Sequence, residues 1–239
     1  GKTGQILSGF LLDKIEERLQ KKEQVILMQN RRGFSPIIRC GDCGVLETCP
    51  DCNVPMAYHR TGPPLKCHYC GHSIDRIPAN CRSCNSLNIR MFGTGTQKIE
   101  TIIGETFSNA SFERLDMDTS KTGTALTNTI SSFGSGDVDI LIGTQMISKG
   151  LDFENATLVG ITNADTGLFL PDFRSGERLF QLIYQTAGRA GRRKKPGEVV
   201  IQTYNYDNPV IKYASRLDLK KYYSIILNER NDLKYPPFS

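Results

Sequence analysis

Three features are missing from the sequence: an apolar run that could span a membrane, a secretory signal and a complete P-loop. No apolar run approaches the roughly 20 residues that cross a bilayer, and no secretory signal opens the chain. A complete P-loop, G-x-x-x-x-G-K-[ST], is also absent; Gly1-Lys2-Thr3 matches only its last part, has no strand before it and is interpreted as a coincidence. We therefore expect neither a membrane-spanning nor a secreted protein.

The bulk properties permit one large domain or two small ones. The chain has 239 residues, of which 38% are hydrophobic and 23% are charged, as in soluble globular proteins. Its formal net charge of +5 is compatible with nucleic acid binding but does not diagnose it. Because the first methionine is Met28, we expect a piece of a longer protein.

Eight cysteines are the most informative feature that is present. They form four C-x-x-C pairs, namely Cys40 and Cys43, Cys49 and Cys52, Cys67 and Cys70, and Cys81 and Cys84. Two thiolates at that spacing lie on one tight turn and reach one metal ion, and a tetrahedral zinc needs two such pairs. Disulfides are disfavoured because their usual setting is a small secreted domain. We predict two structural zinc sites that leave no coordination position open.

The order of the pairs allows two arrangements. In a sequential arrangement the first pair joins the second, and the third joins the fourth. In a nested arrangement the outer pairs share one ion (Cys40, Cys43, Cys81, Cys84) and the inner pairs share the other (Cys49, Cys52, Cys67, Cys70). We favour nesting because it brings both ends of the segment together, which suits an insertion that leaves its host domain and returns at one place.

All three histidines, His59, His68 and His72, lie in the same stretch as the cysteines. They could substitute for a thiolate ligand. Since eight cysteines already suffice for two tetrahedral sites, we expect the histidines beside the sites or at the surface.

The segments around the cysteines alternate between helix and strand patterns. Apolar residues at helical spacing predict helices at residues 7–20, 96–107, 124–133, 175–190 and 218–233. Short apolar runs predict strands at residues 24–30, 89–92, 112–116, 138–142, 157–162 and 198–203. Such alternation predicts an α/β fold, an open and mostly parallel sheet with helices on both faces, whose ligands bind beyond the carboxyl ends of the strands.

Two segments near the expected strand ends are weak candidates for chemistry. Residues 92–98, FGTGTQK, are glycine-rich and open a helix, so their backbone N–H groups could meet a phosphate, although an ordinary turn explains them as well. Residues 143–153, GTQMISKGLDF, crowd polar side chains at a strand end. That pattern suits contact with nucleotide and nucleic acid, or a plain surface loop.

A third segment, QTAGRAGR at residues 185–192, gives a stronger signal. On a helix Gln185, Arg189 and Arg192 share one face. Two guanidinium groups with small residues between them suit a polyphosphate that approaches closely. A solvated basic helix end does not explain the repeated Gly-Arg with alanine, so we predict contact with phosphate.

Together these segments resemble superfamily 2 helicases and, more narrowly, the PriA family of bacterial replication restart. QTAGRAGR is similar to helicase motif VI, and ILIGTQMISKGLDF at residues 140–153 is similar to motif V. QNRRGF at residues 29–34 and DFRSGER at residues 172–178 narrow the match. The resemblance covers nearly the whole chain and implies a second RecA-like helicase lobe with the two-zinc module inserted in it. It also implies the nested zinc pairing and a cytoplasmic bacterial protein.

The resemblance implies an ATP-dependent helicase that moves 3′ to 5′ on DNA, recognises stalled or abandoned forks and D-loops, and initiates primosome assembly. Its implied partners are DNA as forks, D-loops and single strand, primosome proteins and single-stranded DNA-binding protein. By match to motif VI, Gln185, Arg189 and Arg192 would face the γ-phosphate of ATP. By match to motif V, the nucleotide contacts would be Gly150 and Asp152, and the DNA contacts Thr144, Gln145 and Lys149.

The Walker A and Walker B motifs of such a helicase are missing, so we expect half of an ATP site and no activity from this chain alone. ATP and Mg²⁺ would then bind only together with the missing first lobe. The expected boundaries are residues 1–39 and 85–239 for the lobe and 40–84 for the insertion, with a helix and linker to a missing domain at 218–239. Two alternatives stay open: a zinc-dependent interaction module for DNA or protein on a non-catalytic RecA-like scaffold, and an unrelated superfamily 2 helicase, in which embedded cysteines are unusual.

Overall fold

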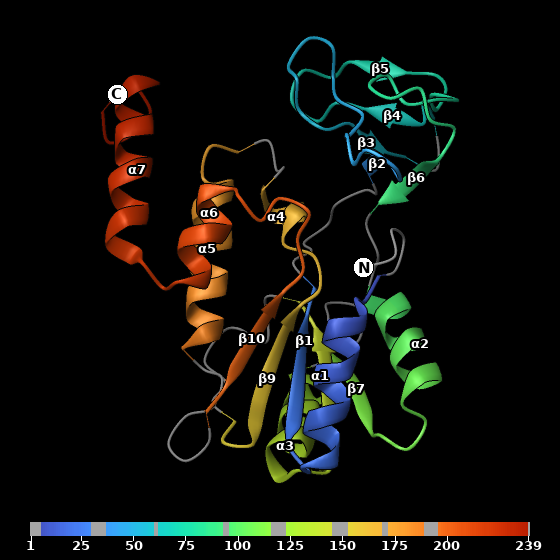
Figure 1. Cartoon of the computed structure of the whole chain (residues 1–239), viewed down its shortest axis with the longest axis vertical. Helices are drawn as coiled ribbons and strands as arrows, with labels where there is room; N and C mark the ends of the chain where they lie inside the picture. Colours follow the sequence, from blue (N-terminus) through green and yellow to red (C-terminus); the bar gives the residue numbers. More distant parts are fainter. Residues whose placement is uncertain are drawn as a thin grey trace.

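The computed structural model describes residues 6–29, 37–59, 62–92, 96–115, 123–144, 153–168, 172–188 and 196–238. These residues form two sheets of different character, a parallel one and an antiparallel one, each of five strands. The antiparallel sheet lies beyond the carboxyl ends of the parallel strands (Figure 1). In the described part of the chain no helix combines the length and the apolar character needed to cross a membrane.

The parallel sheet is the core of the lobe, and its strand order is β10-β9-β1-β8-β7. Its strands are β1 (Gln24–Met28), β7 (Phe112–Leu115), β8 (Ile140–Gly143), β9 (Ala156–Ile161) and β10 (Glu198–Ile201). Each neighbouring pair runs parallel. The predicted α/β fold with a mostly parallel sheet is confirmed.

The central strand β1 is buried on both faces, which explains its unbroken apolar run. Val25 and Leu27 face one hydrophobic cluster, whereas Ile26 and Met28 face the other. Side chains alternate across a strand, so a strand covered by helices on both sides reads as continuously apolar.

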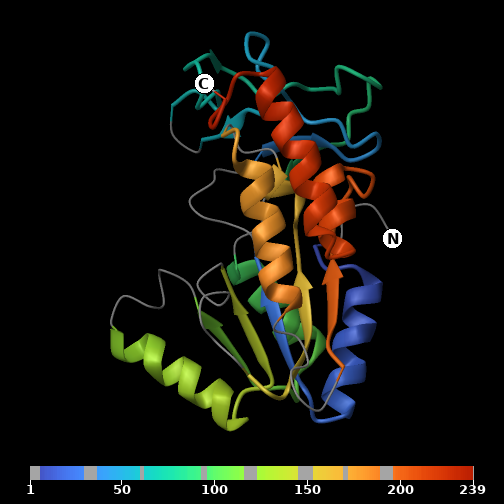
Figure 2. The same ribbon diagram turned by 90° about the vertical axis from the view of Figure 1, so that its left-hand side faces the viewer.

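Helices cover both faces of this sheet. One cluster packs β1 against α1 (Gly9–Gln20) and α2 (Thr96–Thr106). The opposite cluster packs the sheet against α3 (Gly123–Ser135), α5 (Ser175–Ala187) and α6 (Pro209–Ser215). Figure 2 shows α1 and α3 on opposite sides of the sheet.

The C-terminal helix α7 (Leu219–Asp232) attaches to α5 rather than to the sheet. The ring of Tyr222 stacks on that of Phe180 with centroids 3.9 Å apart. Asp218 caps the helix by accepting a hydrogen bond from the backbone N–H of Lys221 at 3.0 Å. Its predicted span, residues 218–233, agrees with the observed one to within a residue at each end.

The antiparallel sheet carries the cysteines, and its strand order is β5-β4-β3-β2-β6. Its strands are β2 (Ile37–Cys40), β3 (Ala57–Tyr58), β4 (Leu65–Lys66), β5 (Ser73–Ile74) and β6 (Ile89–Phe92). We call this sheet and its loops, residues 37–92, the zinc module. The expected insertion, residues 40–84, is shorter in sequence than the zinc module. The difference arises because β2 and β6, which flank the cysteines, pair with each other and belong to the same sheet.

One predicted strand belongs to the other sheet. Residues 89–92 were expected as a strand of the lobe, but as β6 they pair antiparallel with β2. A short apolar run predicts a strand but not the strand that it pairs with. The strand was therefore predicted correctly, and its assignment to the sheet of the lobe was wrong. The short helices α4 (Asp165–Leu168) and α6 were not predicted.

The close approach of β9 to its neighbours gives a stability prediction. A Cβ atom on Gly160 would lie 2.8 Å from Leu27 Cδ2 and 2.9 Å from Leu11 Cδ1. We expect Gly160→Ala to lower the free energy of unfolding by about 1–3 kcal/mol, because the packed core must shift. Gly9→Ala in α1 is the control, since a Cβ there meets nothing within 4 Å. Urea unfolding of the two variants checks this, and equal stabilities would contradict it.

Candidate functional site

The eight cysteines lie on four turns that share one backbone conformation. The residue after the second cysteine of each pair has a positive φ, and these residues are Gly44 (78°), Asn53 (56°), Gly71 (82°) and Asn85 (58°). Its backbone N–H donates to the carbonyl of the first cysteine at 2.8–3.2 Å in all four turns. Glycine and asparagine adopt this left-handed conformation at the lowest cost. The pattern C-x-x-C-[GN] was therefore a signal for these turn residues that the sequence analysis missed.

The two cysteines of a turn differ in their surroundings. The first cysteine of every pair is buried, with exposed fractions of 0–6%, whereas the second is exposed or half-buried. Three of the first cysteines accept a backbone N–H from the residue two positions on, as Cys40 does from Asp42 at 3.4 Å. Donation from the backbone N–H of Cys43 lowers the pKa of Cys40 to about 6. The turn of Cys40 and Cys43 therefore favours the thiolate form of its buried cysteine, whereas burial raises the pKa of Cys49.

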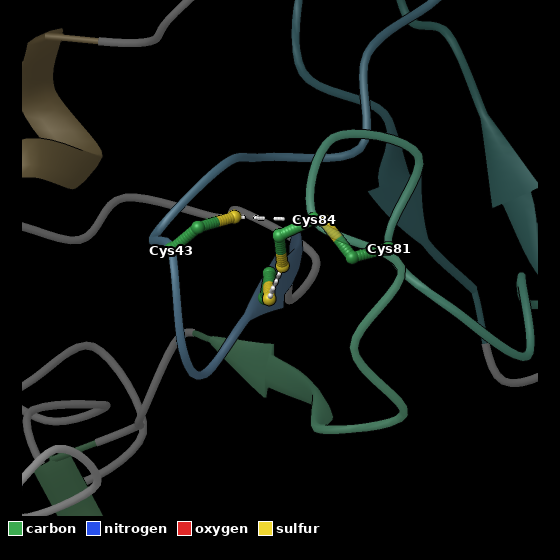
Figure 3. A group of neighbouring side chains, drawn as sticks. Cys43, Cys81 and Cys84 are labelled. Carbon is green, nitrogen blue, oxygen red and sulfur yellow. Dashed lines mark hydrogen bonds between the residues drawn. The ribbon is translucent and has the colours of Figure 1, made fainter.

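The turns bring the thiols together in two groups of four. One group consists of Cys40, Cys43, Cys81 and Cys84, and the other of Cys49, Cys52, Cys67 and Cys70. Within each group the ligand atoms lie within 4.8 Å of one another. In Figure 3 the side chains of Cys43, Cys81 and Cys84 point toward one another. Outer pairs thus meet outer pairs and inner pairs meet inner pairs, which is the nested arrangement.

The geometry of each group fits a zinc ion. Contacting sulfurs lie 3.6 Å apart between Cys40 and Cys84, 3.5 Å between Cys43 and Cys81, and 3.6 Å between Cys49 and Cys70. A tetrahedral site with zinc–sulfur bonds of about 2.3 Å requires sulfur–sulfur edges of about 3.8 Å. Four thiolates fill a tetrahedron, so the groups suit structural and not catalytic zinc.

Electrostatics within a group also call for a cation. The hydrogen-bonded Cys70 thiol raises the pKa of Cys52 to about 12. The neighbouring sulfurs therefore disfavour a negative charge on Cys52, because like charges at this distance repel. A divalent cation among the sulfurs removes that conflict and lets all four ionise.

The histidines lie outside both four-cysteine groups. His59 Nε2 and His68 Nε2 lie 3.1 Å apart, and His72 Nδ1 lies 2.9 Å from Asp51 Oδ2. The backbone carbonyl of His72 accepts the N–H of Cys67 at 2.7 Å, which helps to close the third turn. Their expected role beside the sites stays a prediction.

The described parts of the two helicase-like segments meet at the carboxyl end of β1. Met28, the last residue of β1, lies in register with Gly143, and Thr144 follows Gly143 directly. Thr186 Oγ1 lies 3.3 Å from Met28 Sδ, which brings the end of α5 to the same place. Gln185 precedes Thr186 and is exposed.

Most of the other predicted site residues lie outside the described part of the chain. They are Gln145, Lys149, Gly150, Asp152, Arg189 and Arg192. The helix that was expected to extend to residue 190 is α5, which ends at Ala187 with Gly188 as its cap. The shared helical face of Gln185, Arg189 and Arg192 therefore stays a prediction.

A buried carboxylate at the same edge of the sheet was not predicted. Asp165, at the start of α4, is 5% exposed. It accepts hydrogen bonds from Thr203 Oγ1 at 2.6 Å, the backbone N–H of Tyr204 at 2.9 Å and Asn205 Nδ2 at 3.0 Å. Sequence separation hid this cluster, because its members come from segments about 40 residues apart.

Two known protein families match different parts of the chain, one in the zinc module and one mainly in the lobe. Residues 49–74 match the family described as PriA DNA helicase Cys-rich region domain, and residues 76–194 match the helicase conserved C-terminal domain. The replication restart protein PriA of Bacillus subtilis is 47% identical over 228 residues, which cover 95% of this chain and 28% of that protein. The PriA proteins of Chlamydia pneumoniae and Treponema pallidum are each 40% identical over 99% of this chain, covering 32% and 36% of those proteins. The chain thus spans about a third of the length of these curated relatives.

The left-handed turn after the second cysteine can be tested at Asn53, which is exposed. We expect Asn53→Val to destabilise the turn by about 1–2 kcal/mol, because a β-branched residue is strained at positive φ. Asn53→Gly should be close to neutral. Hydrogen exchange of the amides in residues 49–54 measures the effect. Ser73→Val, at an exposed position of β5, controls for added apolar surface, and equal effects of the two valines would refute the prediction.

Proposed function

We propose that this chain, which belongs to the PriA family of replication restart proteins, forms the second motor lobe and the zinc-binding module of an ATP-dependent DNA helicase. The observation that supports this most is the meeting of its two helicase-like segments at the end of β1, where Thr144 follows β8 and Thr186 contacts Met28. Ligands of open parallel sheets bind at this edge.

The proposed reaction is hydrolysis of ATP at the cleft between this lobe and a first lobe. Gln185, Arg189 and Arg192 would face the γ-phosphate, where arginines stabilise the charge that develops during transfer. Gly150 and Asp152 would contact the nucleotide, and the first lobe would supply the P-loop lysine and the acid that holds Mg²⁺. Because this sequence has no complete P-loop, we propose that the chain by itself does not hydrolyse ATP.

The proposed substrate is DNA. Thr144, Gln145 and Lys149 would contact the strand while the motor moves 3′ to 5′. By similarity to the replication restart proteins we propose that the whole protein acts at stalled forks and D-loops and initiates primosome assembly. Primosome proteins and single-stranded DNA-binding protein are its proposed partners.

The arginines provide the test of the motor assignment. In the longer protein that carries this lobe, we expect Arg189→Ala or Arg192→Ala to lower ATP turnover by about 10³-fold or more, since an arginine finger contributes on that order. DNA-stimulated phosphate release measures it. Arg216→Ala, which removes an exposed arginine after α6, should leave turnover unchanged.

Two results would contradict this assignment. Unchanged turnover in both Arg189→Ala and Arg192→Ala would favour a zinc-dependent interaction module on a non-catalytic scaffold. Robust DNA-stimulated hydrolysis by the 239-residue chain alone would show that the active site is not shared with another lobe.

Two zinc ions per chain, held in the nested pattern, are the proposed metal content. Elemental analysis should give about two zinc ions for the unaltered chain. The double variant Cys40→Ser, Cys84→Ser should retain one ion, because both changes fall in one nested group. Sequential pairing would lose both four-thiolate sites in that variant. The matched double variant Cys40→Ser, Cys52→Ser should give the opposite outcome, with no complete site left by nesting.

A further inference from the structure

A contact between an arginine and a tyrosine joins the zinc module to the motor lobe. Arg39 lies on β2 of the module, and its guanidinium carbon is 3.4 Å from the centroid of the Tyr204 ring. Tyr204 lies in the lobe, in the segment that follows β10. A guanidinium over an aromatic face is attracted by the ring and also stacks on it, which makes the contact directional.

The first cysteine group fixes the module side of this contact. Arg39 Nε donates a hydrogen bond to the backbone carbonyl of Gly44 at 2.9 Å. Gly44 is the residue that closes the turn of Cys40 and Cys43 with a φ of 78°. A Cβ atom at Gly44 would lie 2.6 Å from Arg39 Nη2, so the glycine also leaves the room in which the guanidinium lies.

A buried carboxylate fixes the lobe side. Asp165 accepts the backbone N–H of Tyr204 at 2.9 Å and also binds the side chains of Thr203 and Asn205, the residues on either side. With both flanking residues hydrogen-bonded to one buried group, the backbone that carries the Tyr204 ring has little freedom. Both partners of the contact are therefore held by hydrogen bonds within their own part of the molecule.

Charge within the module favours the contact with the lobe. Arg39 lies directly opposite Arg90 in the pairing of β2 with β6. Like charges at opposite positions of an antiparallel pair are unfavourable. The stack on Tyr204 therefore gives the Arg39 guanidinium a partner that its cross-strand neighbour does not offer.

We infer that Arg39 is the positioning residue that holds the zinc module in one orientation over the carboxyl edge of the motor sheet. The first cysteine group directs it through the carbonyl of Gly44. Loss of metal from that group loosens the turn and releases the module, whereas the second group, which lies farther along the module, does not act on Arg39. Its link to the first cysteine group rests on the proposed zinc binding, whereas the contact between Arg39 and Tyr204 rests on neither zinc binding nor ATP hydrolysis.

The test measures whether the module and the lobe tumble as one body. Relaxation of backbone ¹⁵N nuclei in the 239-residue chain gives a rotational correlation time for β2 and β6 and another for the lobe strands. In the unaltered chain their ratio should be about 1, and in Arg39→Ala it should fall toward about 0.5, as expected for a module on flexible connections. Tyr204→Leu should give the same loss from the lobe side, while Tyr204→Phe, which keeps the ring, should restore the ratio to about 1.

Two cysteine variants and one arginine variant complete the design. Cys84→Ser opens the first group and should behave as Arg39→Ala does, whereas Cys70→Ser opens the second group and should leave the ratio near that of the unaltered chain. Arg76→Ala, at an exposed position of the module, removes the same charge away from Tyr204 and should also leave it unchanged. A zinc content of two per chain in Arg39→Ala and Tyr204→Leu shows that the module is folded.

Each contrary result removes a defined part of the inference. A ratio near 1 in both Arg39→Ala and Tyr204→Leu overturns the positioning role, because other contacts then hold the module. A fall in Arg76→Ala as large as that in Arg39→Ala overturns the specific stack in favour of general charge. A ratio near 1 in Cys84→Ser overturns the link to the first cysteine group. Failure to bind two zinc ions in the unaltered chain contradicts the proposed metal content. The Arg39→Ala ratio still tests the positioning role of Arg39 in that case.

Discussion

Four thiol groups whose sulfurs lie within 4.8 Å of one another cannot all ionise without a cation between them, and the zinc module depends on that constraint. The apolar core of the module is small, with Ile38, Met56 and Leu65 packed against the buried Cys49 and Cys67. Three of its five strands have only two residues each. Such a sheet buries little apolar surface, so we expect the proposed zinc binding to contribute much of its folding free energy.

The nested pairing of the cysteines allows the chain to leave the lobe and return to it at nearly the same place. The chain leaves the parallel sheet after β1 and returns to it at α2, and β2 pairs with β6 along four residue pairs between these points. The outer cysteine group lies at one end of this pair, since Cys40 is the last residue of β2 and lies opposite Ile89, the first residue of β6. The segments by which the chain enters and leaves the module are therefore held side by side. The parallel sheet forms on both sides of β1 without any strand of the module.

The sequence predicted those features that depend on local pattern. Buried strands and amphipathic helices of the lobe were found because burial on two faces or on one face leaves a readable period. The four metal turns were found from spacing alone. The sheet that contains residues 89–92 was missed because IRMF reads alike in either sheet, and pairing is decided by residues some fifty positions away. The stack of Arg39 on Tyr204 could not be predicted, since an arginine and a tyrosine 165 positions apart carry no local signal.

Both the module and the proposed nucleotide site lie at the carboxyl edge of the parallel sheet, and only a few residues separate them. Asp165 accepts a hydrogen bond from the backbone N–H of Tyr204, and it is the first residue of α4, which follows β9. Thr162, between β9 and α4, donates its backbone N–H to the carbonyl of Met28 at 3.0 Å, and Met28 contacts Thr186 near the end of α5. The route runs from Tyr204 to Asp165 by a hydrogen bond, along the backbone of residues 162–165, and then from Thr162 to Met28 and Thr186 through buried groups. These contacts connect the place where the module meets the lobe, at Arg39 and Tyr204, with the end of α5.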